Sequence, residues 1–368
     1  MINVFENNSI SMFHPSSWGA GSIDKYQIIK KIGKGVYGEV YKGICKQTGK
    51  KVALKKINLK LYSEGFPHTA IREIIIVKIL NHENVVKLFE IVKSSDNVIS
   101  KDYSIYIVFE YLKHDLSGLM LSPYIQAFAL PHIKSLLLQL CAGLAYIHEN
   151  GIIHRDIKTS NIFLSKIGLL KIGDFGLARQ YYGSSTYTKN MVTISYRAPE
   201  LLLGDSNYTN AIDMWSVGCI FAELLLKVTL FPEETDIGQL ELIWELCGTP
   251  DVNKWKSVEK LELYQKYRPK KSKPRKIKKT FAKLPKDALN LLDKFLKLNP
   301  SKRITAKKAL KHQFFKNPPF PSLPKSIVNY PSSHEMGSFE IRKSILENIK
   351  MPKKRFRTNQ SDGLFELK

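Results

Sequence analysis

The sequence predicts an α+β protein made of a small β-rich unit with one helix, followed by a larger, mainly helical unit. Short runs of alternating apolar and polar residues, bounded by glycines, fill residues 26–112, and helical spacing replaces them beyond Asp115. A length of 368 residues with 43% hydrophobic content is ample for buried cores. We predict a flexible lead at 1–25, a folded region at 26–315, and a Pro-rich, then basic, tail at 316–368.

The elements of the folded region follow from their periodicity and their flanking residues. Strands are predicted at 26–35, 37–44, 50–57, 85–92 and 103–112, and a helix, TAIREIIIVKIL, at 69–80. Helices of the larger unit are predicted at 132–151, 213–227 and 288–297. We therefore place the small unit at 26–110, a connecting hinge at 111–115 and the helical unit at 116–315.

The net charge of +24 is concentrated in one part of the chain. Residues 1–250 carry a balance of only +3, whereas 251–316 carry +17 and 341–368 carry +5. Eight of the twelve residues at 268–279 are Lys or Arg, which raises nucleic acid as a partner. Because this stretch lacks interleaved aromatic residues and Cys/His signatures, direct nucleic-acid binding is not expected.

Apolar runs and cysteines restrict the class of protein further. The longest apolar runs, such as 135–146 and 217–226, are shorter than the ~20 residues that cross a membrane, and the N-terminus shows no basic region before an apolar run. The four cysteines lie far apart and match neither zinc nor disulfide spacing. We expect an intracellular protein without a membrane span.

A glycine-rich turn and a strand lysine are the first signals of chemistry. Gly33, Gly35 and Gly38 form G-x-G-x-x-G between two predicted strands, where glycine lets backbone amides approach phosphate oxygens. A dinucleotide site would need a helix after the glycines, and a strand follows. Lys55 in the next strand could reach phosphates, with Glu73 of the helix holding it extended. Taken singly, each of these residues fits an ordinary turn, strand or helix surface equally well.

The decisive signal is an ordered set of three motifs. The segment HRDIKTSN at 154–161 carries Asp156 and Asn161, DFG begins at Asp174, and APE ends at Glu200. Two carboxylates and an amide at this spacing could supply a base for a hydroxyl group and two oxygen ligands for Mg²⁺. Each triplet could occur by chance, but the ordered set is too specific for that.

With these motifs in this order, the sequence resembles the eukaryotic protein kinases over residues 26–315. The resemblance implies a bilobal kinase fold and transfer of the ATP γ-phosphate, with Mg²⁺ as cofactor. It implies that Asp156 accepts the substrate hydroxyl proton, Lys158 steadies the phosphoryl group, and Asn161 and Asp174 hold Mg²⁺. The implied ATP-binding residues are Ile32, Gly33, Lys34, Gly35, Val36, Tyr37, Gly38, Glu39, Val40, Lys55, Glu73, Glu110 and Leu112.

Further motifs resemble the cyclin-dependent kinases, of the serine/threonine class. PHTAIRE at 67–73 resembles their cyclin-contacting helix, and LCGTP at 246–250 fits the same group. Arg197 matches an arginine that ties up a backbone carbonyl beside the pocket for the residue after the target Ser or Thr, which implies Ser/Thr-Pro substrates. The run HDLSGLM at 114–120 and the layout of 255–281 resemble the transcriptional branch, whose substrate is the RNA polymerase II C-terminal repeat domain. Promotion of transcription elongation is implied.

The resemblance also implies regulation and a location. Thr188 stands where the family carries an activating phosphothreonine, so a separate activating kinase is expected. Arg72, Arg155 and Arg179 match the arginines that would surround its phosphate. Tyr37 matches an inhibitory phosphotyrosine of cell-cycle members but fits a packing tyrosine as well. Subfamily and the two basic clusters, 268–279 and 350–357, imply the nucleus, with the cytoplasm as a second location.

Two positions depart from the family pattern, and three alternatives stay open. Ser195 stands where Trp is usual beside the substrate-proline pocket, and Val36 replaces Thr in the glycine-rich turn. The alternatives are a cell-cycle cyclin-dependent kinase, a non-catalytic scaffold and a basic nucleic-acid-binding protein.

Asp213 and Arg303 match structural positions of the family, Arg303 as the partner of Glu200. The local charge predicts a basic surface for nuclear import or for docking an acidic, already phosphorylated substrate through Lys270, Lys271, Lys273 and Arg275.

Overall fold

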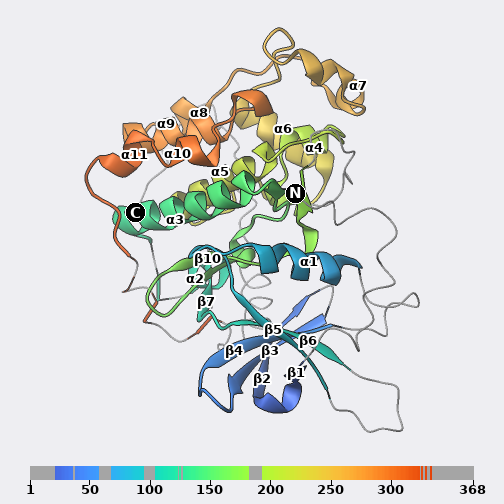
Figure 1. Cartoon of the computed structure of the whole chain (residues 1–368). Helices are drawn as coiled ribbons and strands as arrows, with labels where there is room; N and C mark the ends of the chain where they lie inside the picture. Colours follow the sequence, from blue (N-terminus) through green and yellow to red (C-terminus); the bar gives the residue numbers. More distant parts are fainter. Residues whose placement is uncertain are drawn as a thin grey trace.

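The chain folds into a β-rich N-lobe and a larger helical C-lobe, so the predicted α+β class is confirmed (Figure 1). A computed structural model describes residues 21–35, 38–57, 68–94, 104–122, 124–125, 127–181, 193–323, 325, 328–329 and 332–333. The predicted residues Val36, Tyr37, Pro67 and Thr188 lie outside these ranges. In Figure 1 the sheet occupies the lower part of the molecule and the helices of the C-lobe lie above it.

A six-stranded sheet forms most of the N-lobe. Its strands are β1 (Gly21–Ser22), β2 (Tyr26–Gly35), β3 (Gly38–Cys45), β4 (Lys51–Ile57), β5 (Leu88–Lys93) and β6 (Ile105–Glu110), in the order β1-β5-β6-β4-β3-β2. The five predicted strands are present, with ends displaced by at most three residues. Leu54, Val92 and Val108 are buried on one face, which explains the alternation in the sequence.

The predicted flexible lead was wrong at its last residues. β1 pairs in parallel with β5, Gly21 opposite Val92, and a short 3-10 turn, η3 (Ile23–Lys25), leads into β2. The Ser22 hydroxyl accepts a hydrogen bond from the Asp24 backbone N–H at 3.1 Å. A strand of two residues has no periodicity that the sequence could show. β1 forms because it pairs with β5, which lies far along the chain.

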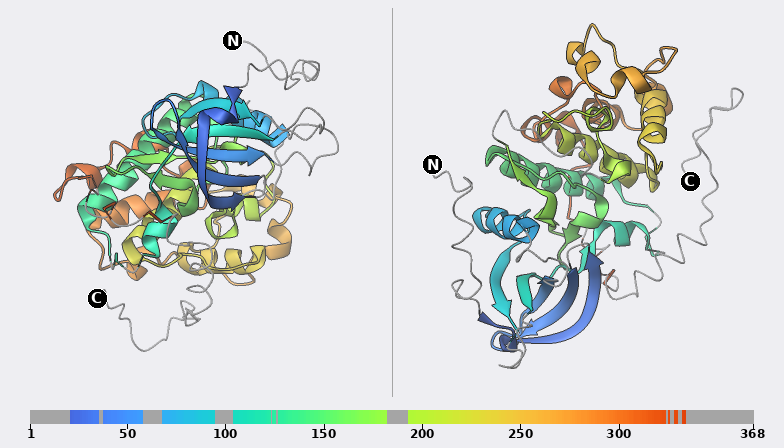
Figure 2. Two further views of the ribbon diagram at one scale, coloured as in Figure 1. Left: turned by 90° about the horizontal axis from the view of Figure 1, so that it is seen from below. Right: turned by 90° about the vertical axis from the view of Figure 1, so that its right-hand side faces the viewer.

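Helix α1 (His68–Ile79) lies between the sheet and the C-lobe (Figure 2). Ala70, Glu73, Ile74 and Val77 are buried, at the i, i+3, i+4, i+7 spacing of one helical face. This face packs on η6 (Phe175–Leu177), the turn that follows Asp174. The position of α1 therefore sets how close Glu73 comes to the junction between the lobes.

Two long helices form the centre of the C-lobe. α3 (Leu130–Glu149) packs against α5 (Ala211–Leu226), which is buried along nearly its whole length. Within the described residues, α3 has the length and composition of a membrane span, but a buried core helix has the same properties, and most of α3 is buried. The other helices are α2 (Leu116–Met120), α4 (Pro199–Leu202), α6 (Asp236–Cys247), α7 (Tyr264–Tyr267), α8 (Ile277–Thr280), α9 (Lys286–Phe295), α10 (Ala306–Ala309) and α11 (Gln313–Lys316), with 3-10 turns η8 (Lys256–Lys260) and η9 (Pro300–Lys302).

Short strands at the base of the C-lobe frame the residues with predicted chemistry. β9 (Ile162–Leu164) pairs with β10 (Leu170–Ile172) and with β7 (His114–Asp115), while β8 (Ile152–Ile153) pairs with β11 (Arg179–Gln180). The turns η5 (Thr159–Asn161) and η7 (Ile194–Tyr196) complete this region. Because β8 precedes Asp156 and β11 follows Asp174, their pairing brings the two predicted carboxylates to one place.

Candidate active site

Lys55 connects the sheet, the helix and the loop at the lobe junction. Its ammonium nitrogen lies 2.8 and 2.7 Å from the two carboxylate oxygens of Glu73 and 3.2 Å from Asp174 Oδ1. β4 supplies the lysine, α1 the glutamate, and the turn after β10 the aspartate. The structure thus brings together the two residues that the resemblance pairs, Lys55 and Glu73, and adds a direct contact to Asp174.

The electrostatics of this trio favour the charged forms of Lys55 and Asp174, whereas burial raises the pKa of the Glu73 carboxyl above its usual range. Burial alone would lower the pKa of Lys55, but attraction to Asp174 and Glu73 raises it above its ordinary value. The same lysine holds the pKa of the Asp174 carboxyl below its usual range. The lysine therefore stays a cation, and Asp174 stays an anion with 44% of its side chain exposed.

A second cluster surrounds Asp156, which is 5% exposed. Lys158 Nζ lies 2.8 Å from Asp156 Oδ2, and Asn161 Nδ2 donates to the same oxygen and to the Asp156 carbonyl, both at 2.9 Å. The hydroxyl of Thr193 donates to Asp156 Oδ1 at 3.2 Å and accepts from Lys158 Nζ at 3.2 Å. Both carboxylate oxygens of Asp156 are therefore held in fixed directions beside the Lys158 ammonium.

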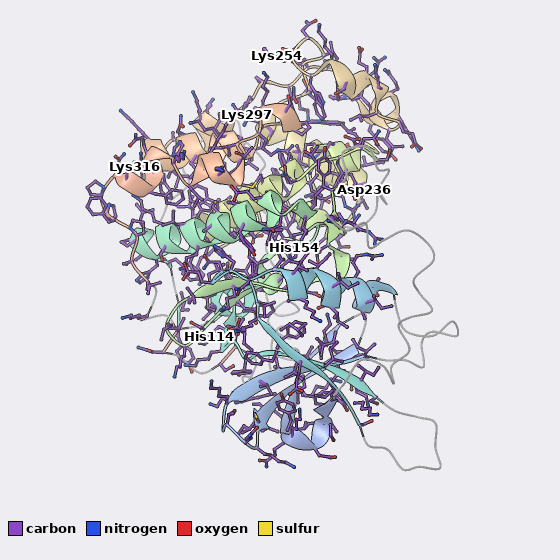
Figure 3. All side chains as sticks on the ribbon, in the orientation of Figure 1. His114, His154, Asp236, Lys254, Lys297 and Lys316 are labelled. Atoms are coloured by element: carbon purple, nitrogen blue, oxygen red, sulfur yellow. The ribbon has the colours of Figure 1, made fainter. Side chains whose placement is uncertain are left out.

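Asp213 of α5 holds the loop that carries Asp156. Its carboxylate accepts hydrogen bonds from the backbone N–H groups of His154 at 3.0 Å and Arg155 at 2.9 Å, and lies 2.9 Å from His148 Nε2. Burial alone would raise the pKa of Asp213, but the hydrogen bond and charge of His148 hold it below the usual range. These bonds fix Arg155 at a φ of 68°, a strained angle that a loop alone would not keep. Figure 3 shows His154 at this central position.

The predicted metal ligands fit a small, hard cation. Asn161 uses its amide nitrogen on Asp156, and its side-chain oxygen accepts no hydrogen bond from the residues that the structure describes. Asp174, at a φ of 59°, presents a half-exposed carboxylate. Mg²⁺ commonly takes only one or two ligands from the protein, because substrate phosphates and water supply the others. One carboxylate and one amide oxygen fit this number.

The predicted hinge lies between β6 and α2. Phe109 and Leu112 are buried, and the Glu110 carboxylate accepts a hydrogen bond from the Lys87 backbone N–H at 2.8 Å and lies 2.9 Å from Lys171 Nζ. The Glu110 side chain therefore anchors the start of the hinge to the C-lobe strand β10. The binding of ATP by Glu110 and Leu112 stays a prediction.

The glycine-rich turn connects β2 and β3. Gly33 lies opposite Val40, Lys34 opposite Glu39, and Gly35 opposite Gly38 across the ladder. Ile32 is half-buried. This ladder places the turn beside the strand of Lys55, because Val40 is also the ladder partner of Lys55.

The predicted regulatory arginines come from three elements. Arg155 donates from Nε to the Leu177 carbonyl at 2.7 Å and from Nη1 to the Tyr208 hydroxyl at 2.8 Å. Arg72 lies on α1 one residue before Glu73, and Arg179 lies in β11. Because Thr188 is outside the described residues, the gathering of these arginines around it stays a prediction.

Arg197 takes a partner that the sequence did not indicate. Its Nη1 lies 2.7 Å from Asp236 Oδ1 in the first turn of α6. Nearby, Gln239 of the same helix donates from Nε2 to the Ile194 carbonyl at 2.9 Å. α6 therefore holds residues 194–197, which include Ser195, the residue that replaces the usual Trp.

The tail supplies contacts that the sequence reasoning missed. Ser333 Oγ accepts from the Asp115 backbone N–H and donates to Asp115 Oδ2, both at 3.1 Å, while Ser332 Oγ donates to the Lys113 carbonyl at 2.6 Å. Lys113 Nζ donates to the Val328 carbonyl at 2.8 Å. The segment was predicted only as an irregular Pro-rich tail, and no local pattern marks it as a partner of the hinge.

Glu200 and Arg303 form a buried bidentate pair behind the site. The two nitrogen–oxygen distances are 2.7 and 2.8 Å, and both side chains are at most 1% exposed. Arg303 also donates to the Ala211 carbonyl at 2.7 Å, which ties the pair to the start of α5. This contact fixes the APE segment to the C-lobe core.

Comparisons with known proteins agree with this fold and site. Residues 26–315 match the family model of the protein kinase domain. Cyclin-dependent kinase C-1 of Arabidopsis thaliana is 46% identical over 333 residues, which cover 87% of this chain and 66% of that protein. Cyclin-dependent kinase 12 of Caenorhabditis elegans is 44% identical over 334 residues, covering 89% and 46%. Cyclin-dependent kinase 9 of Xenopus tropicalis is 43% identical over 332 residues, covering 86% and 87%.

The two-lobed fold, the lysine–glutamate pair and the family match together define a protein kinase. Within that class, the chain belongs to the cyclin-dependent kinases. Its relatives include cyclin-dependent kinases 9, 12 and C, which confirms the predicted transcriptional branch. The chain spans just under two thirds of the length of the plant relatives that it matches.

Proposed function

We propose that this chain is a cyclin-dependent serine/threonine kinase that transfers the ATP γ-phosphate to Ser/Thr-Pro sites. The observation that carries the proposal is the contact of Lys55 with both Glu73 and Asp174, at 2.7 to 3.2 Å. A lysine held between the helix and the loop of a kinase positions the nucleotide phosphates, and catalysis of phosphoryl transfer is mostly positioning and electrostatics.

In this proposal Asp156 accepts the proton of the substrate hydroxyl. Asn161 and Thr193 direct its two oxygens, and Lys158 beside it supplies positive charge to the transferred phosphoryl group. General-base catalysis of this kind contributes about 10²- to 10⁴-fold. Lys55 aligns the ATP phosphates, and the backbone of the glycine-rich turn covers them.

Asn161 and Asp174 would hold the Mg²⁺ that accompanies ATP. The side-chain oxygen of Asn161, which accepts no hydrogen bond from the described residues, and the exposed carboxylate of Asp174 support this assignment. When bound, the metal neutralises phosphate charge. Lys55 keeps Asp174 ionised, which maintains the carboxylate as a ligand at neutral pH.

A cyclin partner and an activating phosphorylation complete the proposal. α1 carries Glu73 on its buried face, so a cyclin that contacts this helix near its start would stabilise the pair with Lys55. Phosphorylation of Thr188 by a separate kinase would add about −1.5 to −2 charges for Arg72, Arg155 and Arg179 to bind. Substitution of Thr188 by Ala should then reduce activity, and loss of binding by a phospho-specific probe would identify the site.

We propose the RNA polymerase II C-terminal repeat domain as the substrate, promotion of transcription elongation as the role and the nucleus as the location. The similarity to cyclin-dependent kinases 9 and 12 supports this choice over a cell-cycle role. Arg197, paired with Asp236, lies where a substrate proline would bind in the proposal.

The test is a kinase assay of the full chain with a cyclin on YSPTSPS-repeat peptides. The variant Asp156→Asn keeps the side-chain shape but removes the base, and Asp251→Asn, on the surface, is the matched control. We expect the control to keep full activity and the base variant to lose at least about a hundredfold. Equal activity of both variants would overturn the proposal, and activity confined to Ser-Pro peptides without repeats would favour the cell-cycle alternative.

A further inference from the structure

The positive charge of residues 251–316 divides into cations that hold the fold together and cations that face solvent. Arg275 belongs to the first group: it lies 2.8 Å from Asp293 and donates to the carbonyls of Cys247 and Leu296 at 3.1 and 2.8 Å. Lys273 pairs with Glu245 at 3.1 Å. The predicted docking surface of Lys270, Lys271, Lys273 and Arg275 was therefore wrong in part, because two of its four cations are used within the C-lobe.

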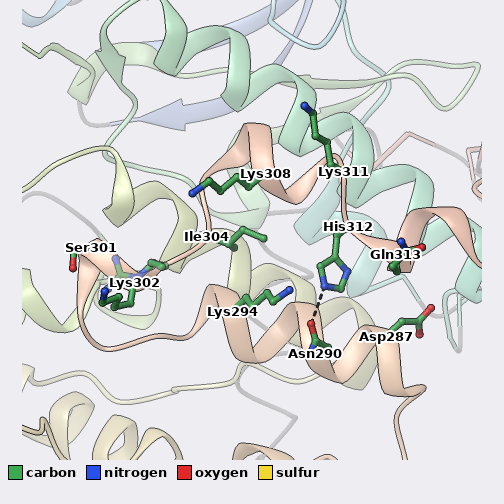
Figure 4. A pocket seen from close by; sticks show the side chains of 11 residues that line it. Asp287, Asn290, Lys294, Ser301, Lys302, Ile304, Lys308, Lys311, His312 and Gln313 are labelled. Carbon is green, nitrogen blue, oxygen red and sulfur yellow. Dashed lines mark hydrogen bonds between the residues drawn. The ribbon is translucent and has the colours of Figure 1, made fainter. Parts of the chain in front are cut away.

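The second group gathers at a groove formed by α9, η9, α10 and α11 (Figure 4). The groove has a volume of about 790 Å³ and is open to solvent. Four exposed lysines line it, and no residue in the described part of the chain forms an ion pair with any of them. They are Lys294, Lys302, Lys308 and Lys311.

The groove contains little negative charge to offset these lysines. Its single acidic lining residue, Asp287, already accepts hydrogen bonds from the Ala288 backbone N–H at 2.8 Å and from Asn317 Nδ2 at 3.2 Å. Four ammonium groups around one open depression repel each other, and an anion bound between them removes that repulsion. The surface is therefore suited to a polyanion.

The remaining lining favours a peptide over a nucleic acid. Ile304 contributes an aliphatic contact, and the His312 ring, with Nε2 2.9 Å from Asn290 Oδ1, closes one side. Burial lowers the pKa of His312, so the ring is neutral at pH 7 and acts as a polar wall. The groove lining holds no Phe, Tyr or Trp on which a base could stack.

Hydrogen bonds within the C-lobe fix the shape of the groove. Arg303 lies at its base, where it pairs with Glu200 and donates to the Lys297 and Leu298 carbonyls at 3.1 and 3.2 Å. The Thr305 hydroxyl caps α10 by accepting from the Lys308 backbone N–H at 3.3 Å. These bonds hold η9 and α10 in place, so binding costs little ordering of the backbone.

We propose that this groove docks a phosphorylated, acidic segment of the protein substrate while another segment occupies the active site. The inference rests on the proposed function, because a repetitive substrate that the kinase has already phosphorylated provides both segments on one chain. Tethering through the groove would raise the local concentration of the next repeat at Asp156. The kinase would then act faster on partly phosphorylated repeats than on unphosphorylated ones.

The test measures binding and turnover with the same full-length chain. A labelled peptide of YSPTSPS repeats with phosphoserine in several repeats is titrated by fluorescence anisotropy against the wild type and two variants. The first variant replaces Lys294, Lys302, Lys308 and Lys311 by Gln. The matched control replaces four exposed lysines of the C-lobe outside the groove, namely Lys256, Lys260, Lys266 and Lys283, by Gln.

We expect the groove variant to bind the phosphopeptide at least about tenfold more weakly, with the control within about twofold of the wild type. Both variants should phosphorylate a short, single-repeat peptide as the wild type does. The groove variant alone should lose the preference for pre-phosphorylated repeats. Salt should weaken wild-type binding and narrow the difference between the proteins.

Three results would overturn the inference. They are equal phosphopeptide binding by the wild type and the groove variant, equal weakening by the control variant, and tighter groove-dependent binding of single-stranded RNA than of the phosphopeptide. Absence of turnover on the short peptide by the wild type with its cyclin would instead contradict the proposed function. Phosphopeptide binding is measured without turnover, so failure of the docking inference and failure of the proposed function can be distinguished.

Discussion

Thr193 donates a hydrogen bond from its hydroxyl to Asp156 Oδ1 at 3.2 Å, although the two residues lie 37 positions apart in the sequence. The same hydroxyl accepts from Lys158 Nζ at 3.2 Å. Thr193, in the segment between Asp174 and Glu200, thus touches both the proposed base and the proposed phosphoryl-binding lysine. The orientation of the Asp156 carboxylate therefore depends on the position of this segment.

Replacing Thr193 should therefore slow the chemical step. Thr193→Ala removes a hydrogen bond to a charged group, worth about 1.5–3 kcal/mol, so kcat should fall by about tenfold or more. The KM for ATP should stay unchanged, because the hydroxyl does not contact the nucleotide-positioning Lys55. Thr193→Ser keeps the hydroxyl and should retain most activity. Equal kcat values for the Ala and Ser variants in steady-state assays would contradict this role.

The pair of Lys55 and Glu73 should control nucleotide use. Glu73→Gln preserves the side-chain shape but removes the negative charge that lies 2.7 and 2.8 Å from the Lys55 ammonium. Asp174, at 3.2 Å, is then the remaining charged partner of Lys55. We expect kcat/KM for ATP to fall by about a hundredfold, in line with the loss of a buried charge pair. Glu83→Gln changes an exposed residue shortly after the end of α1 and is the control. This variant should have the same kcat/KM for ATP as the wild type.

The buried pair of Glu200 and Arg303 should matter for stability. Arg303→Lys cannot reproduce two bonds to the carboxylate and those to backbone carbonyls, so it leaves buried acceptors without donors. The free energy of unfolding should fall by about 3–5 kcal/mol, which lowers the thermal midpoint by about 10 °C. The neighbouring exposed change Lys302→Gln should shift the midpoint by less than about 2 °C in the same scan.

Local periodicity predicted most of the fold. α3, α5 and the strands of the sheet carry apolar spacing that only one secondary structure satisfies, and they appear within a few residues of their predicted ends. The ordered motifs likewise indicated Lys55, Glu73 and Asp174 as one site, since their meeting is a property of the fold that those motifs accompany.

Contacts between distant, aperiodic segments escaped prediction. β1 exists because the edge of β5 is available, and two residues hold no pattern of their own. Thr193 and Ser333 act through single hydroxyls whose partners lie 37 and 218 positions away. Arg275 looked like a free surface cation, because the sequence does not show that Asp293 approaches it. Such contacts follow only from the assembled chain.

The hinge contacts of the tail predict a measurable protection. The Asp115 backbone N–H donates to Ser333 Oγ at 3.1 Å, and Ser332 Oγ donates to the Lys113 carbonyl at 2.6 Å. Replacing both serines by Ala should speed hydrogen exchange at the Asp115 amide by about tenfold, because its acceptor is lost. The KM for ATP should rise a few-fold as the hinge loosens. Unchanged exchange at Asp115 would show that the tail does not restrain the hinge.

A buried glutamate should make stability depend on pH. Burial raises the pKa of Glu223 from 4.5 to about 7, and its Oε2 accepts from the Tyr196 hydroxyl at 2.9 Å, which in turn lies 3.0 Å from Thr159 Oγ1 beside Asn161. Since the folded-state pKa lies above the unfolded value, the folded chain binds this proton more tightly. The resulting stabilisation is complete below about pH 4.5 and is lost as the pH rises through about 7.

Glu223→Gln removes this titration while keeping an acceptor for Tyr196. The free energy of unfolding of the wild type should therefore decrease relative to the variant by about 3 kcal/mol between pH 4.5 and pH 8. Denaturant midpoints of both proteins across this range measure the difference, and Glu241→Gln, an exposed change, should run parallel to the wild type. If the free energies of unfolding of the wild type and Glu223→Gln differed by the same amount at every pH, Glu223 would have its ordinary pKa. Glu223 would then be ionised at neutral pH where it accepts the hydrogen bond from Tyr196.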